Sequence, residues 1–126
     1  MTVFDISNAE AEVLNVLWQQ SPMSANDIIE RLNEEREWHE KTVKTLLNRL
    51  VKKGAVDFEK DKRRYLYFPV LEQSSYQQHA SQSLVQRLFS GRVSPLVAGF
   101  AKNNNLQKDD IESLKKLISD WEQEND

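Results

Sequence analysis

One run of residues, 39–54, constrains the fold of this chain more than any other. Its apolar side chains recur three or four residues apart, as one face of an amphipathic helix requires. These side chains are Val43, Leu46, Leu47, Leu50 and Val51. Two lysines and Gly54 follow, which is the usual last turn and left-handed end of a helix. The run therefore predicts a helix that other apolar elements must cover.

The opposite face of this helix carries cations and short hydrogen-bonding side chains and no carboxylate. Ordinary solvated helices mix acidic and basic side chains, so a face of this kind suits a polyanion. Cations can pair with phosphates, and Thr, Asn and Arg can reach base edges in a major groove wide enough for one helix. We expect a DNA-binding face made by Lys41, Thr42, Lys44, Thr45, Asn48, Arg49 and Lys52. Within it, Lys44, Thr45 and Arg49 are expected to approach bases. Lys41, Thr42 and Lys52 are expected to hold the DNA backbone.

The charge distribution supports this expectation although the chain has a net charge of −3. Residues 39–69 carry nine basic and four acidic side chains, whereas residues 1–38 carry two and eight, and residues 70–126 carry six and eight. The positive charge is therefore concentrated in one segment. Such a local footprint is what a DNA-binding face needs even in an acidic protein.

Two shorter helices precede the basic one. Ser7 and Glu10 have the spacing of a capping box, and Ser24 can cap the next helix in the same way. Their apolar stripes contain Val13, Leu14, Leu17, Trp18, Ala25, Ile28, Ile29 and Leu32. The connection between the two helices is short, and Trp38 is expected to anchor the acidic segment that leads into the third helix.

After Gly54 the pattern changes to the alternation of β-strands. Two aromatic-rich runs flank a basic turn at residues 60–64, and Pro69 ends the second run because it cannot donate to a ladder. Three helices followed by a hairpin is the order of a winged helix, in which the third helix enters the major groove and the wing touches phosphates. We therefore expect residues 1–69 to form a DNA-binding domain, with Arg63 and Arg64 on its wing.

Residues 70–126 predict three further amphipathic helices. The first runs from about residue 72 to 90 and ends at Gly91, the second is capped by Ser94 with Pro95 as its first residue, and the third spans about residues 108–123. Their apolar surface is too large for them to bury alone, so we expect a dimerisation domain. Its interface is expected at Leu84, Leu88, Leu96, Val97, Phe100, Leu114, Leu117, Ile118 and Trp121. The fold class is thus mainly α with a small β-hairpin wing.

Several classes of function find no support in the residues. The chain has no Cys and only three Gly, so it lacks thiolate sites and a glycine-rich phosphate loop. The acidic segment around His39 lacks any established metal-ligand spacing. No apolar run approaches the length of a membrane span. We expect a cytoplasmic protein that is not an enzyme and has no metal or cofactor.

Three runs of residues carry a family resemblance: 24–28, 41–54 and 96–102. Together they resemble the penicillinase and methicillin-resistance repressors of the BlaI/MecI/CopY type. The resemblance implies a homodimeric winged-helix repressor that binds an inverted-repeat DNA operator, in a beta-lactam-resistance or stress-response operon. It places the family's base-reading and phosphate-contacting positions on Lys41, Thr42, Lys44, Thr45, Arg49, Arg63 and Arg64.

The chain departs from this family at its inducer-sensing features. Antibiotic-responsive members are cut at an Asn-Phe bond after a membrane sensor protease is triggered, and the matching pair here is Gly99-Phe100. The missing Asn argues against cleavage at this bond. Copper-responsive members use a C-terminal cysteine cluster, which this sequence lacks.

Two other functions stay open from the residues alone. A winged helix with a basic face can serve as an adaptor or antirepressor that binds an acidic protein. A ligand-gated regulator with a small-molecule pocket in the C-terminal region would share the same DNA-binding face.

Overall fold

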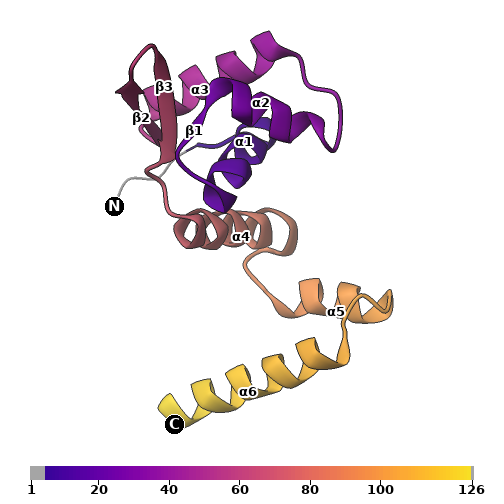
Figure 1. Ribbon diagram of the computed structural model, residues 1–126. Helices are drawn as coiled ribbons and strands as arrows, with labels where there is room; N and C mark the ends of the chain where they lie inside the picture. The colour runs from indigo at the N-terminus through magenta and orange to yellow at the C-terminus, as the bar shows by residue number, and fades with distance from the viewer. Residues whose placement is uncertain (1–4, 126) are drawn as a thin grey trace. The chain divides into compact units, whose positions relative to one another are not determined.

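The structure is a computed structural model that describes residues 5–125 (Figure 1). These residues form six helices and three strands, in an order that matches the sequence prediction. The elements are α1 (Asn8–Gln19), β1 (Met23–Ser24), α2 (Ala25–Asn33), α3 (Glu40–Lys53), β2 (Val56–Asp61), β3 (Arg64–Pro69), α4 (Gln73–Phe89), α5 (Ser94–Lys102) and α6 (Lys108–Glu124). The chain divides into two compact units, Met1–His79 and Ala80–Asp126.

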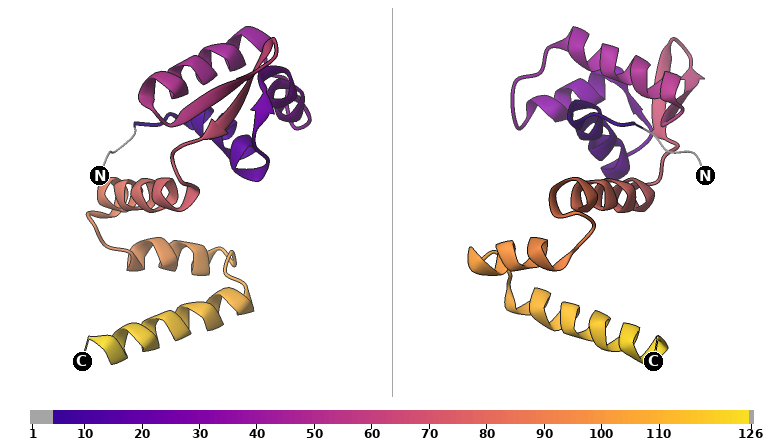
Figure 2. Two further views of the ribbon diagram at one scale, coloured as in Figure 1. Left: turned by 60° about the vertical axis from the view of Figure 1, so that its left-hand side comes forward. Right: turned by 180° about the vertical axis from the view of Figure 1, so that it is seen from behind.

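The first unit is built around one hydrophobic core. Helices α1, α2 and α3 pack together with the sheet beside them, as the two further views in Figure 2 show. The core consists of Val13, Leu14, Val16, Leu17, Met23, Ile28, Leu32, Val43, Leu46, Leu47, Leu50, Ala55 and Val56. Trp18 and Trp38 pack against it, partly buried, so the prediction that Trp38 anchors the loop before the third helix is confirmed.

The helix ends have the predicted chemistry. Ser7 Oγ accepts the Glu10 N–H at 3.1 Å while Glu10 Oε1 accepts the Ser7 N–H at 2.9 Å, which is a complete capping box. Ser24 Oγ accepts the Asp27 N–H at 3.2 Å at the start of α2. Gly54 ends α3 with φ of 82°, a conformation that costs little only for glycine. Local hydrogen bonding thus sets where α1 and α2 begin, and the left-handed Gly54 sets where α3 ends.

The wing is the predicted antiparallel hairpin, with one strand added. β2 and β3 pair from Val56 opposite Pro69 to Asp61 opposite Arg64. On the other side of β3 lies β1, so the sheet order is β1-β3-β2. The prediction of a two-strand wing omitted β1 because a strand of two residues is too short to show a sequence period. Its pairing ties the segment between α1 and α2 to the wing.

The segment that follows the wing belongs to the first unit. Trp18 Nε1 donates to the Leu71 carbonyl at 2.9 Å, and the rings of Trp18 and Tyr76 lie 5.7 Å apart. The compact unit therefore extends into the first half of α4, to His79, whereas the sequence prediction ended the domain at residue 69.

The second unit contains the rest of α4 together with α5 and α6. α4 ends as predicted near Gly91, which has φ of 86°. The prediction that Ser94 caps α5 is wrong: Val93 is the N-cap, with helical φ and ψ of −79° and −33°, and Ser94 is already the first helical residue. The chain enters the helix one residue early, so no side chain caps α5.

Candidate nucleic-acid interface

The outward face of α3 carries all seven side chains predicted to contact DNA on this helix. On the inward face, Val43 and Leu50 are fully buried, and this packing fixes the rotation of the helix about its axis. The predicted residues are therefore all exposed: Lys41, Thr42, Lys44, Thr45, Asn48, Arg49 and Lys52. One continuous polar surface results, which a groove of DNA can reach.

The first turn of α3 organises two of these side chains. His39 is the N-cap, and its Nδ1 accepts the Lys41 N–H at 3.3 Å. The Thr45 hydroxyl donates to the Lys41 carbonyl at 2.9 Å, so its proton is engaged within the helix. Thr45 consequently offers its methyl group and an acceptor oxygen to an outside partner, and a threonine methyl can contact the methyl group of thymine.

The face is not free of carboxylate, contrary to the sequence prediction. α3 begins at Glu40, and Glu40 Oε1 lies 2.7 Å from Lys44 Nζ. The hydrogen bond from Lys44, reinforced by its charge, lowers the pKa of the Glu40 carboxyl below its usual value. The signal for this contact is the Glu-to-Lys spacing of four residues on one helix.

The two predicted arginines lie at the tip of the wing. Arg63 and Arg64 are both exposed, and the turn between the strands has Lys62 at φ of 60°. Arg64 Nη2 is 3.7 Å from Asp61 Oδ2, a loose and exposed ion pair. Such a pair contributes little to stability, so Arg64 can exchange this carboxylate for another anion at low cost.

A groove of about 370 Å³ joins the wing to the two neighbouring helices. It brings Lys44 of α3 together with Arg64 of the wing, and it also exposes two residues that sequence reasoning missed, Asn26 and Tyr65. Its lining is Ser24, Ala25, Asn26, Asp27, Lys44, Arg64, Tyr65 and Tyr67. Asn26 lies in the first turn of α2, and the available signal was that helix N-termini attract phosphates.

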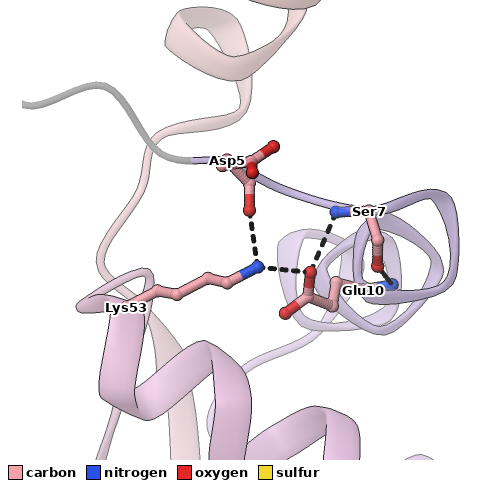
Figure 3. A network of polar contacts seen from close by, with 4 residues as sticks. All are labelled: Asp5, Ser7, Glu10 and Lys53. Carbon is pink, nitrogen blue, oxygen red and sulfur yellow. Dashed lines mark hydrogen bonds and ion pairs between the residues drawn. The ribbon is translucent and has the colours of Figure 1, made fainter.

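Lys53, the last residue of α3, does not belong to the outward face. Its Nζ lies 2.7 Å from Glu10 Oε1 and also donates to the Asp5 carbonyl (Figure 3). Glu10 is 2% exposed. Burial raises the pKa of this carboxyl, but the hydrogen bonds from Lys53 and Ser7 outweigh burial and lower it below its usual value. The pair therefore fastens the end of α3 to the start of α1.

The residues predicted for the dimer interface lie on α4, α5 and α6. Four of them are partly buried within the chain: Leu84, Leu96, Val97 and Leu114. Five are exposed large apolar side chains: Leu88, Phe100, Leu117, Ile118 and Trp121. Gly99 and Phe100, the pair at the family's cleavage position, lie inside α5.

Two further findings concern residues 5–125. This part of the chain contains no group of three or more His, Asp or Glu side chains that could hold a metal ion. None of its helices is both long and apolar enough to cross a membrane.

Comparison with known proteins agrees with the geometry of the N-terminal unit. A family model described as penicillinase repressor matches residues 6–120. Over 116 residues the chain is 35% identical to the methicillin resistance regulatory protein MecI of Mammaliicoccus sciuri. The aligned residues cover 92% of this chain and 94% of that protein.

Two solved structures of the repressor BlaI also match. The DNA-binding domain of BlaI is 39% identical, with a TM-score of 0.54 over 60% of this chain and 92% of that one. The monomeric form of BlaI from Bacillus licheniformis, in complex with the blaP half-operator, is 39% identical with a TM-score of 0.52 and the same coverage. The chain belongs to the penicillinase repressor family, whose members are transcriptional repressors rather than enzymes, and its N-terminal unit has the winged-helix fold of their DNA-binding domain.

Proposed function

We propose that this protein is a homodimeric transcriptional repressor that acts in the cytoplasm on an inverted-repeat DNA operator. The observation that carries the proposal is the exposed face of α3, which presents seven polar or basic side chains. The opposite face of α3 packs in the hydrophobic core, and the basic wing lies beside the helix. Its relative BlaI has been solved on a half-operator, which supports the same use of this unit here.

The side chains divide into two proposed roles. Lys44, Thr45 and Arg49 lie on the exposed face of α3 and are proposed to reach base edges. The remaining basic and hydroxyl groups are proposed to hold phosphates, and these are Lys41, Thr42, Lys52, Arg63 and Arg64. Asn48 lies on the same face and can serve either purpose, since its amide both donates and accepts hydrogen bonds.

A second copy of the chain is the proposed occupant of the exposed apolar surface on α4 to α6. Leu88, Leu117 and Trp121 are each at least 60% exposed, and Ile118 is 58% exposed. Leu117, Ile118 and Trp121 lie within one helix, α6, and a large exposed apolar surface of this kind marks an interaction site in a protein. A two-fold dimer would present two α3 helices to the two halves of a palindromic site, whose spacing such proteins match.

The test is the binding of purified protein to its own upstream promoter DNA and to scrambled DNA, by fluorescence anisotropy across a salt series. Affinity should favour the promoter and should fall steeply as salt rises, because each phosphate contact releases counterions. Arg49→Ala should weaken promoter binding by about 1–3 kcal/mol and reduce the preference over scrambled DNA.

Two variants calibrate that result. Arg63→Ala should weaken binding to both DNAs alike and reduce the salt slope by about one, as expected for a phosphate contact. Lys115→Ala removes the same charge from an exposed position on α6 and should change neither quantity. Equal and weak binding of the wild type to both DNAs would refute sequence-specific repression and would favour an acidic protein as the partner of the basic face.

A further inference from the structure

The first turn of α3 holds an ion pair on the face proposed for DNA. Lys44 Nζ lies 2.7 Å from Glu40 Oε1, and the two side chains are 52% and 61% exposed. Glu40 is the only acidic residue in α3. A carboxylate repels phosphates, so its place among the DNA-facing side chains weakens binding to any DNA backbone. Its place in the first turn and its pairing with Lys44 stabilise the helix, and the same place brings the pair to the side of α3 proposed to face bases.

The pair complements the major-groove edge of a C·G base pair. That edge presents the cytosine N4 amino group as a donor beside guanine O6 and N7 as acceptors. N4 and O6 are the two ends of a Watson–Crick hydrogen bond, so they lie about 2.9 Å apart. Glu40 and Lys44 present the opposite pattern at nearly the same spacing, an acceptor oxygen beside a donor nitrogen at 2.7 Å.

The chemistry of each partner allows both contacts at once. A glutamate can accept from cytosine N4, and a lysine can donate to guanine O6 or N7. An ammonium group has three N–H donors, so Lys44 keeps two after it donates to Glu40. An ionised carboxylate only accepts hydrogen bonds, and the hydrogen bond from Lys44 favours this form by lowering the pKa of Glu40.

Glu40 and Lys44 lie in the part of the helix that contacts bases in related DNA-binding motifs. In helix-turn-helix proteins the N-terminal residues of the recognition helix contact base edges. Glu40 is the first residue of α3 and Lys44 lies one turn further on. Lys44 also lines the groove that it shares with Arg64 of the wing, so it lies where helix and wing converge.

We propose that Glu40 and Lys44 act together to read one C·G base pair in each half of the operator. Glu40 accepts a hydrogen bond from cytosine N4, and Lys44 donates to guanine. This inference rests on the proposed function and adds a specificity-determining residue, Glu40, to it. It also predicts effects of opposite sign for the loss of the carboxylate: weaker discrimination at one base pair and stronger binding to DNA of any sequence.

The experiment selects binding sites from a library of random DNA duplexes with the purified full-length protein, followed by sequencing. Wild type should select sites with a conserved C·G pair in each half. Glu40→Ala and Lys44→Met should each lose about tenfold in preference at that pair and keep the preferences elsewhere. Glu40→Gln should accept adenine at the same position, because glutamine pairs with adenine.

A matched control is available on α6, where Lys116 and Asp120 form another pair four residues apart, at 3.1 Å. Asp120→Asn removes one negative charge and one such pair without touching α3, and it should leave every base preference unchanged. Glu40→Gln keeps the size of the side chain, so its folded state can be verified by thermal unfolding against wild type.

The possible failures are distinguishable. If wild type selects a site and both Glu40 variants retain each base preference, the reading of C·G by this pair is wrong while the proposed function stands. If wild type selects no sequence at all, sequence-specific repression fails and the inference fails with it.

Discussion

The two units of this chain differ in where they place their apolar side chains. In the N-terminal unit, helices α1 to α3 and the sheet bury thirteen apolar residues in one core. In the C-terminal unit, Val85 is the only buried residue among those described, and α5 and α6 bury none. A helix gains most of its stability in a protein by packing an apolar face. The first unit therefore has an internal source of stability, whereas the second is proposed to gain its stability from a second copy of the chain.

The largest expected effect is a difference in stability between two equivalent truncations, Leu to Ala, one made in each unit. Leu50→Ala removes a fully buried side chain of α3 and should lower the free energy of unfolding by about 2–5 kcal/mol. Leu117→Ala removes a side chain that is 65% exposed, so in dilute protein it should leave that free energy nearly unchanged. Urea unfolding at low and high protein concentration measures both. Equal losses for the two variants in dilute protein would contradict the comparison.

A smaller loss should follow from breaking the ion pair between buried Glu10 and partly exposed Lys53 in the first unit. Glu10→Gln should lower the free energy of unfolding by about 1–3 kcal/mol, because Lys53 then loses its carboxylate partner. The lowered pKa of Glu10 means that its contribution is present above the ordinary value of 4.5 and is lost as pH falls through the folded value.

The pH dependence provides the control for this variant. As pH drops from 4.5 through the lower pKa of folded Glu10, the unfolding free energy of wild type should fall, and that of Glu10→Gln should fall less over the same range. Parallel curves for the two proteins would show that the pair contributes no pH-dependent stability.

The smallest effect on folding, with a clear effect on assembly, is expected at Trp121. This side chain is 63% exposed on α6 and is proposed to be covered by the second copy. Trp121→Ala should weaken dimerisation by about tenfold or more, since buried aromatic anchors carry much of an interface. Sedimentation equilibrium measures the dissociation constant, and an unchanged constant would remove Trp121 from the interface.

Sequence patterns predicted much of the first unit because its signals are local. The capping box at Ser7, the Ser24 cap, the left-handed Gly54 and the alternation of the wing strands each depend on a few neighbouring residues, and the structure has all of them. The apolar period of α3 also predicted which of its side chains are exposed.

The sequence could not show features that depend on contacts between distant segments. The two-residue strand β1 exists through its pairing with β3. Lys53 looked like one more basic residue at a helix end, but it turns toward Glu10, which is far away in the sequence. Serine is a residue type that often caps helices, but Val93 and not Ser94 is the N-cap of α5, because the backbone becomes helical one residue earlier than predicted. The pairing of Glu40 with Lys44 was local and could have been found from its spacing.

Two chains, joined through their C-terminal helices, are proposed to place two α3 helices on one inverted repeat. Sedimentation velocity of wild type with the promoter fragment that it binds, and with one half of that fragment, measures how many chains occupy each DNA. We expect two chains on the whole site and one chain, bound much more weakly, on the half-site. In Trp121→Ala we expect loss of the two-chain complex at low protein concentration. A single chain bound to the whole site, with affinity equal to that for the half-site, would contradict the proposed arrangement.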